Sequence, residues 1–329
     1  MGYLFCLLSA LLFGANGTTT KLLVLGGLEP QQLTLFRSLG TAILAGIALL
    51  ITNPAGFRMR PRQLLTMAIL GVTGIALLQA FYGGALGRLP VGITLLLEYT
   101  GVLFVALVGY FVFKEKVKAR LWVAICLVLV GMVVVAQIWA STLDPLGVVL
   151  ALGAAVTLTV YFVIGERQVS ATSPLTVAFW TGLFAAAFWA IFSGWWNLSP
   201  SIFVKPIDVG GSHGHLDLPL IIPLASAVVL GSFLPFFLSF SALKHLPATA
   251  AGIVASSEVL FAFLVAWLWL GESLQPVQLL GAAVVLVGIV LAQTARVGKV
   301  VDAELAFSPV VATVAPAESG GGGAPSRPR

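Results

Sequence analysis

Long apolar runs separated by short polar connections fill most of this chain. Each run approaches the roughly 20 residues that an α-helix needs to cross about 30 Å of hydrocarbon. Cutting the sequence at its charged residues, prolines and glycines gives ten candidate spans: residues 3–25, 32–52, 64–86, 90–112, 120–140, 145–165, 175–196, 219–243, 247–270 and 276–295. The first span lacks a basic segment before it and an Ala-x-Ala cleavage site, so we interpret it as a retained helix. The pattern predicts an all-α integral membrane protein with ten transmembrane helices.

The composition supports this class. Hydrophobic residues make up 59% of the 329 residues and charged residues 9%, and the mean hydropathy is +1.07. A soluble domain of this length needs more charged surface than that. The net charge of +5 would suit a nucleic-acid partner, but in a membrane protein we interpret basic residues as signals of orientation. The expected partner is therefore the lipid bilayer and not a nucleic acid.

The distribution of basic residues predicts the orientation. With the N-terminus inside, thirteen Lys and Arg residues fall on the cytoplasmic side, and four fall on the outer side: Lys21, Arg37, Arg88 and Lys205. Because basic segments are translocated poorly, both termini are predicted to be cytoplasmic in a multi-pass protein of the cytoplasmic (inner) membrane. Residues 297–329 are rich in Pro, Ala and Gly without an apolar period, which predicts a disordered cytoplasmic tail.

The chain also contains an internal repeat. A shift of 157 positions pairs "ALGRLP" at 85–90 with "ALKHLP" at 242–247, Phe104 with Phe261, Leu107 with Leu264, Glu115 with Glu272, and "LVG" at 129–131 with "LVG" at 286–288. The two halves, residues 1–140 and 141–296, then hold five spans each. Because five is odd, the second half enters the membrane from the opposite side. Two inverted five-helix repeats are typical of secondary transporters, whose substrate site lies near the midplane between the halves.

Two acidic residues lie near the middle of predicted spans. Glu98 falls in the fourth span and Glu258 in the ninth, which the repeat makes equivalent, although the two positions differ by three residues, or about one helical turn. A charge at the bilayer centre costs about 2.5–3.5 kcal/mol even on insertion scales. We therefore predict that these carboxyls face a polar cavity and bind a substrate amine, a proton, or each in turn. The alternative is a structural carboxyl, satisfied at Glu258 by the neighbouring Ser256 and Ser257.

Other polar residues inside the spans are candidates for the same cavity. Arg37, near the outer end of the second span, either pairs with a substrate carboxylate or extends to the lipid headgroups. Amide and aromatic side chains within the spans are predicted to line the pocket: Asn16, Gln79, Tyr82, Tyr99, Tyr161 and Trp180. For the aromatic residues the alternative is an anchor at the lipid interface.

Motifs for enzymatic or cofactor chemistry are missing from the sequence. "HGH" at 213–215 lies in a glycine-rich outer loop without further ligands, and Cys6 and Cys126 stand apart within apolar runs, so no metal site is predicted. There is no Walker loop, dinucleotide fingerprint or nucleophile elbow. We expect no cofactor and no enzymatic activity, and energy coupling, if there is any, from a gradient.

Two five-helix halves that each close with a pattern like "LWLGESLQPVQLLGAAVVLVGIVL" (268–291) resemble the EamA-type transporters of the drug/metabolite transporter superfamily. The resemblance covers residues 3–295. "SEVLFAFLVAWLWLGE" is similar to the family's Glu-Pro-hydrophobic pattern at Glu258, with Val259 at the usual proline, and "LFRSLG" is similar to its second-helix arginine at Arg37. "LEYTGVL" (97–103) is similar to the threonine and homoserine exporter branch, with Val102 in place of proline, and "FKEKV" replaces the expected Leu-Gly-Glu around Glu115.

The resemblance implies an inner-membrane secondary transporter that exports small amino acids or related polar metabolites by alternating access, with coupling to protons as an option. Efflux of drugs or amphipathic cations through the same cavity is the alternative within transport. A non-transporting membrane scaffold or sensor is the alternative of another class, in which the carboxyls only hold helices together.

Overall fold

The computed structural model describes residues 1–111, 119–136, 143–243, 245, 254–273 and 275–295. The predicted tail, Glu115, the first residues of the ninth span and most of the basic residues counted on the cytoplasmic side lie outside these ranges.

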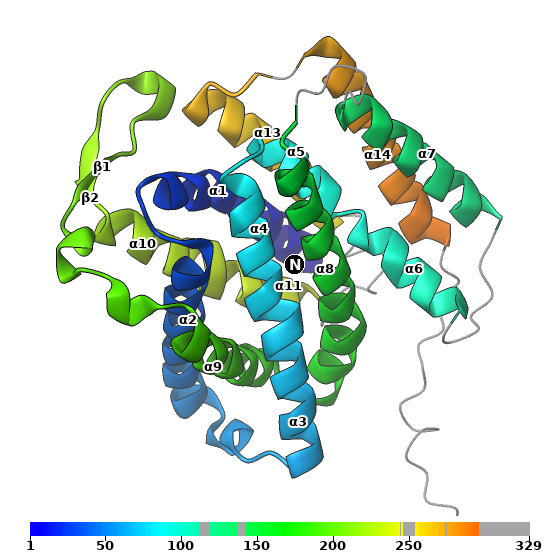
Figure 1. Ribbon diagram of the computed structural model, residues 1–329. Coiled ribbons are helices and arrows are strands. Elements are labelled where there is room, and N and C mark those ends of the chain that lie inside the picture. The colour runs from blue at the N-terminus through cyan, green and yellow to red at the C-terminus, as the bar shows by residue number, and fades with distance from the viewer. Residues whose placement is uncertain (112–118, 137–142, 244, 246–253, 274, 296–329) are drawn as a thin grey trace, which may run out of the picture. The chain divides into compact units, whose positions relative to one another are not determined.

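Helices occupy the predicted spans of the first half (Figure 1). They are α1 (Gly2–Leu25), α2 (Pro30–Thr52), a third span made of α3 (Pro61–Ile69), the π-helix η2 (Leu70–Leu77) and α4 (Leu78–Leu86), a fourth made of α5 (Val91–Glu98) and α6 (Gly101–Phe111), and α7 (Arg120–Ala136). A short 3₁₀-helix, η1 (Pro54–Phe57), follows α2.

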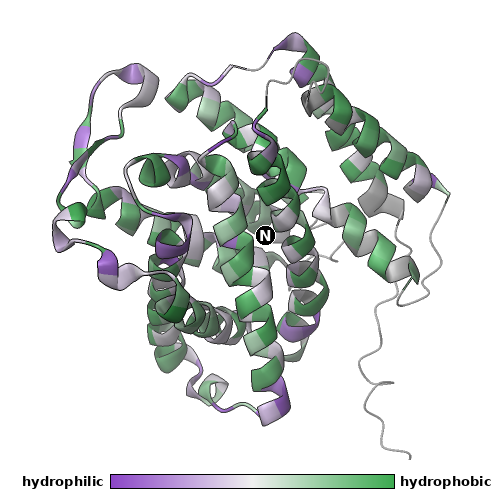
Figure 2. Cartoon of the chain, viewed as in Figure 1, coloured by the Kyte–Doolittle hydropathy of each residue, from purple (hydrophilic) through white to green (hydrophobic). Residues whose placement is uncertain are grey.

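The second half repeats this order. Its helices are α8 (Pro145–Ala171), α9 (Pro174–Phe192), an eighth span made of α10 (Ile221–Val228), the π-helix η6 (Val229–Phe233) and α11 (Leu234–Leu243), then α13 (Ser257–Val265) with the π-helix η7 (Ala266–Leu270), and α14 (Pro276–Ala295). Within the described ranges, six helical segments are long and apolar enough to cross a membrane, and shorter apolar helices accompany them. Hydrophobic residues dominate the helices, while hydrophilic residues gather in the connections (Figure 2).

Local chemistry fixes the starts of several helices. Proline occupies the first position of α2, α3, α8 and α9, where its missing N–H costs nothing. Before α8, the Asp144 carboxylate accepts the backbone N–H groups of Leu146 and Gly147 and a 3.1 Å hydrogen bond from Arg88. The hydrogen bond from Arg88 and that from the Leu146 N–H hold the pKa of Asp144 below its usual value.

The packing between the halves follows the order of the spans within each half. The equivalent helices α2 and α9 pack together, as do α7 and α14, and α1 contacts α11 and α13 much as α8 contacts α4, α5 and α6. A Cβ atom on Gly131 would lie 2.6 Å from a Val285 methyl, and one on Gly288 would lie 2.7 Å from a Val128 methyl. Both pairs are related by the 157-residue shift. This reciprocity is what a two-fold axis between the halves produces.

The fourth and ninth spans are broken, which the sequence did not predict. α5 ends at Glu98 and α6 begins at Gly101, so that residues 99–100 form a turn. In the ninth span, residues 254–255 are helical, Ser256 lies in a turn, and α13 follows. The 157-residue shift places Ser256 on Tyr99, so the two breaks are equivalent. Glu98 is the last residue before one break and Glu258 the second after the other, which accounts for their offset of three.

Side-chain hydroxyls satisfy the backbone carbonyls that the breaks release. In the fourth span, Thr100 donates to the Leu97 carbonyl at 2.6 Å. In the ninth span, Ser257 donates to the Val254 carbonyl at 2.6 Å. Broken helices are tolerated at membrane depth only where protein groups replace the lost hydrogen bonds.

A small hairpin occupies the long connection between α9 and α10. β1 (Pro206–Asp208) pairs antiparallel with β2 (Asp217–Pro219), after the 3₁₀-helices η3 (Trp195–Asn197) and η4 (Pro200–Phe203) and around η5 (Gly211–His213). Trp269 of η7 donates its indole N–H to the Val209 carbonyl at 2.7 Å, which ties the hairpin to the end of the ninth span.

The two histidines of "HGH" lie in this hairpin and contact other residues. The His213 ring packs edge-on against Trp269, and His215 pairs with Asp208 at 2.7 Å. Backbone hydrogen bonds from Gly210 and Leu216, with that of His215, lower the pKa of Asp208. Among the residues that the structure describes, no group of three His, Cys, Asp or Glu side chains could hold a metal ion.

Candidate functional site

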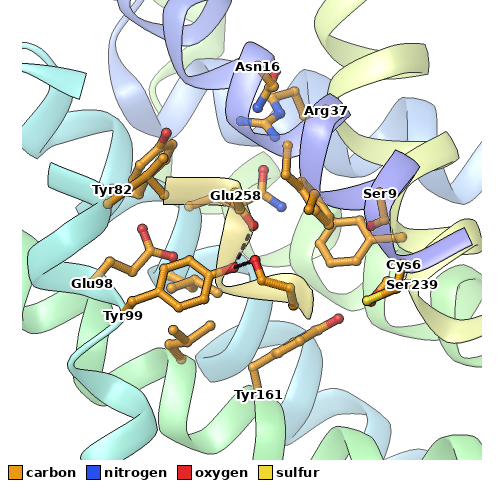
Figure 3. A pocket seen from close by; sticks show the side chains of 18 residues that line it. Cys6, Ser9, Asn16, Arg37, Tyr82, Glu98, Tyr99, Tyr161, Ser239 and Glu258 are labelled. Atoms are coloured by element: carbon orange, nitrogen blue, oxygen red, sulfur yellow. Dashed lines mark hydrogen bonds between the residues drawn. The ribbon is translucent and has the colours of Figure 1, made fainter. Parts of the chain in front are cut away.

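A pocket lies between helices of both halves, at the level of the two breaks (Figure 3). One face of α1 contributes Cys6, Ser9, Ala10, Phe13 and Asn16, whose spacing places them on a single helical stripe. Eight of the nine side chains that the sequence suggested line this pocket: Asn16, Arg37, Gln79, Tyr82, Glu98, Tyr99, Tyr161 and Glu258.

Trp180 is the exception, since it does not line this pocket. Its indole N–H donates to the Gly56 carbonyl at 3.2 Å, and its ring stacks on Phe184. The side chain therefore connects α9 to the turn after α2.

Several buried polar atoms of the pocket have no hydrogen-bond partner. Within the described part of the chain, these are Asn16 Oδ1, Gln79 Oε1, Tyr82 OH and Glu98 Oε2. Buried polar atoms are nearly always paired, because an orphan costs about 1–3 kcal/mol. Four of them at one pocket therefore indicate a place that a polar ligand or water completes.

Arg37 is buried, with 4% of its surface exposed, so it does not extend to the lipid headgroups. Its guanidinium donates to the Ser232 hydroxyl at 2.7 Å, to the Gly231 carbonyl at 2.9 Å and, more weakly, to Thr20 at 3.4 Å. The Gly231 carbonyl is free to accept because Pro235, four residues later, has no N–H for it. Pro235 of the eighth span thus leaves the Gly231 carbonyl available to hold the Arg37 guanidinium of the second span.

Asn16 reaches its position because residue 231 has no side chain. A Cβ atom there would lie 1.9 Å from Asn16 Oδ1. The same contact brings α1 against η6. Figure 3 shows Asn16 and Arg37 close together, with Glu98 and Tyr82 on another wall of the pocket.

Glu258 and Tyr99 form a pair across the halves. The Tyr99 hydroxyl lies 2.6 Å from Glu258 Oε2 and 3.2 Å from the Ala255 carbonyl (dashed lines in Figure 3). Glu98 differs, since one of its oxygens is unpartnered and only 8% of its surface is exposed. The two carboxyls therefore have different surroundings, although the repeat relates them.

Contacts close the pocket beyond Asn16. Gly17 packs against Val91 and the Tyr82 hydroxyl. One turn further, Lys21 Nζ lies 2.5 Å from Glu272 Oε1 and 3.1 Å from the Leu89 carbonyl. Glu272 Oε2 also accepts the Val91 N–H at 2.9 Å. This cluster of Lys21, Glu272, Leu89 and Val91, the end lock, joins α1, the start of α5 and the segment before α14.

Sequence reasoning missed part of the pocket and all of the end lock. Ser9 lies two turns before Asn16 on α1, so the helical period could have indicated it. Phe13 and Phe236, whose rings meet edge-on at 5.0 Å, carry no such signal because apolar aromatic residues occur throughout the spans. Lys21 and Glu272 are 251 residues apart, and nothing local links them.

Comparison with known proteins agrees with this architecture. The model of the EamA-like transporter family matches residues 1–137 and again residues 145–294. A solved crystal structure with 18% sequence identity aligns with a TM-score of 0.62, covering 88% of this chain and 96% of the other. These matches and the apolar helices confirm the predicted all-α membrane fold of ten transmembrane helices in two inverted five-helix repeats.

Curated relatives cover most of the chain. The threonine/homoserine exporter RhtA of Escherichia coli (strain K12) is 29% identical over 258 residues, 78% of this chain and 79% of the relative. A probable terminal-alkyne amino-acid exporter of Streptantibioticus cattleyicolor is 28% identical over 269 residues, 80% of this chain and 84% of the relative. An uncharacterized transporter of Clostridium kluyveri is 23% identical over 301 residues, 88% and 92% of the two chains.

Proposed function

Because the chain belongs to the EamA-like transporter family, we propose that it exports small amino acids, such as threonine or homoserine, across the cytoplasmic membrane by alternating access. The observation that carries this proposal is the set of four unpartnered polar atoms in a pocket with two carboxyls and a guanidinium. The names of the Escherichia coli and Streptantibioticus relatives, both amino-acid exporters, support the substrate class.

Each polar group of the pocket has a complement on a zwitterionic amino acid. The Glu98 carboxylate binds the ammonium group, because its free oxygen lacks a donor. Three of the five N–H groups of Arg37 are used within the protein, and the remaining two are left for the substrate carboxylate. The amide oxygens of Asn16 and Gln79 accept from the ammonium or from a side-chain hydroxyl.

Alternating access follows from the two halves. We assign residues 1–140 and 141–296 to the two units that rock about the pocket, with 297–329 as a tail outside them. The end lock then closes one side of the pocket, and its opening gives access from that side.

Efflux of amphipathic cations is a second candidate. Phe13, Phe236 and Tyr161 form an aromatic wall of the same pocket, and such a wall attracts an apolar cation. A scaffold role instead predicts that loss of the carboxyls destabilises the protein without any flux to lose.

Counterflow in liposomes tests these functions. Vesicles preloaded with one unlabelled compound should take up its labelled form when purified protein is present. We expect exchange of labelled threonine and homoserine and none of tetraphenylphosphonium. Exchange of tetraphenylphosphonium alone favours the drug alternative, and the lack of any exchange by a folded protein favours the scaffold.

Orientation can be tested by thiol labelling. In a background with Cys6→Ala and Cys126→Ala, a cysteine at exposed Leu216 of the hairpin should react with an impermeant maleimide added to intact cells. A cysteine at exposed Ala55, between α2 and α3, should react only after lysis. The opposite pattern contradicts the orientation predicted from the basic residues.

A further inference from the structure

The Tyr99 hydroxyl lies near two hydrogen-bond acceptors but has only one hydrogen to donate. It lies 2.6 Å from Glu258 Oε2 and 3.2 Å from the carbonyl of Ala255, at the break in the ninth span. A hydroxyl has one hydrogen to donate and lone pairs to accept with. It can therefore donate to only one of the two oxygens at a time.

The Ala255 carbonyl depends on this hydroxyl. In an unbroken helix its donor would be the N–H of Val259, four residues later. The Val259 N–H instead donates to the backbone carbonyl of Ser256 at 3.3 Å. Because of the break, the Ala255 carbonyl accepts its hydrogen bond from the Tyr99 hydroxyl. Tyr99 lies at the equivalent break of the fourth span.

We propose that Glu258 is the proton-binding site of the transporter and that Tyr99 transmits its protonation state to the broken ninth span. This inference rests on the proposed function and divides it between the two carboxyls. Glu98 binds the amine, and Glu258 binds the coupling proton.

Two hydrogen-bond arrangements follow. When Glu258 is ionised, the Tyr99 O–H donates to the carboxylate, and the Ala255 carbonyl loses its donor. When Glu258 takes up a proton, its own O–H donates to the Tyr99 oxygen, and the Tyr99 proton turns to Ala255. One added proton therefore creates one added hydrogen bond, which joins the breaks of the fourth and ninth spans.

Charge links the proton to the substrate. An ammonium at Glu98 and a proton at Glu258 add positive charge to the same pocket, so each weakens the binding of the other. The titratable and charged groups that line the pocket with Glu258 come from five helices and from the break in the fourth span: Cys6, Arg37, Tyr82, Glu98, Tyr99 and Tyr161. Protonation of Glu258 then favours release of the amino acid from the pocket. A transporter that exchanges protons for substrate in opposite directions requires this competition.

Three variants in liposomes test the division of roles, with labelled threonine as the probe. In the wild-type protein, an acid interior should accelerate uptake beyond counterflow. Glu258→Gln mimics the protonated carboxyl, so we expect weaker threonine binding with counterflow still measurable, and a reduction of this acceleration at least about tenfold, within the range of typical coupling between sites. Its threonine binding should no longer depend on pH.

Tyr99→Phe separates transmission from proton binding. It keeps the Glu258 carboxyl, so threonine binding should still depend on pH, while the acceleration by an acid interior is lost. Ser257→Ala is the matched control, because it removes a hydroxyl from the Val254 carbonyl at the same break without touching Glu258. This control should retain both properties.

Each failure has its own meaning. Full acceleration in Glu258→Gln places the proton elsewhere, and loss of both binding and counterflow in that variant places Glu258 in the substrate site. Full acceleration in Tyr99→Phe removes Tyr99 from transmission. Wild-type threonine uptake that an acid interior does not accelerate overturns this inference alone, whereas the lack of threonine counterflow in the wild type overturns the proposed function.

Discussion

Glu98→Gln is expected to reduce threonine counterflow at least about tenfold, because a hydrogen bond to a charged group contributes about 1.5–3 kcal/mol. Glutamine keeps the size and hydrogen-bonding capacity of the side chain, but it presents no charge to an ammonium group. Because Glu98 Oε2 has no hydrogen-bond partner among the described residues, the variant loses no hydrogen bond at that oxygen. The measurement is counterflow in liposomes together with thermal unfolding in detergent.

Asp217→Asn is the control for Glu98→Gln, since it neutralises an exposed carboxylate on β2 that does not line the pocket. It should leave counterflow unchanged. Normal counterflow in Glu98→Gln excludes Glu98 from substrate binding. A large drop in its thermal stability instead supports the structural alternative, in which the carboxyl holds helices together.

Breaking the end lock is expected to expose the pocket from the outer side. Lys21→Ala leaves Glu272 with the Val91 N–H as a remaining donor, and Glu272→Gln removes the charge that Lys21 contacts. Both side chains are only 18% exposed, so we expect a cost of about 1–3 kcal/mol for the closed state, between the values for surface and buried pairs. A cysteine at Ala10, which lines the pocket, should then react with an external impermeant reagent at least about fivefold faster.

Charge reversal provides the control for this prediction. The double variant Lys21→Glu with Glu272→Lys should restore slow labelling at least in part, because it re-forms the pair. Arg88→Ala should have little effect, since the Arg88–Asp144 pair is 45% and 35% exposed. If the single variants label at the wild-type rate, the end lock does not hold the pocket closed.

The similarity between the two halves extends to the backbone breaks but not to the side-chain contacts beside them. The repeat predicted that the fourth and ninth spans are equivalent, and the structure places a break at the same repeat position in each. It did not predict that Glu258 has a tyrosine partner while Glu98 keeps an unpartnered oxygen. A repeat specifies equivalent backbones, whereas the partner of a side chain depends on residues that have diverged between the halves.

The sequence by itself determined the membrane class, the ten spans and the two midspan carboxyls, because these depend on composition and on residues close together in the chain. Tertiary structure decided which side chains meet. Arg37 faces Ser232, 195 residues away, and Tyr99 meets Glu258, 159 residues away. Trp180 was a candidate on the same grounds as the other aromatic residues, but its indole N–H donates to the Gly56 carbonyl and its ring lies outside the pocket. Such contacts follow from the crossing of distant helices at glycines and breaks, and the apolar period that identifies a span does not specify which of its faces points inward.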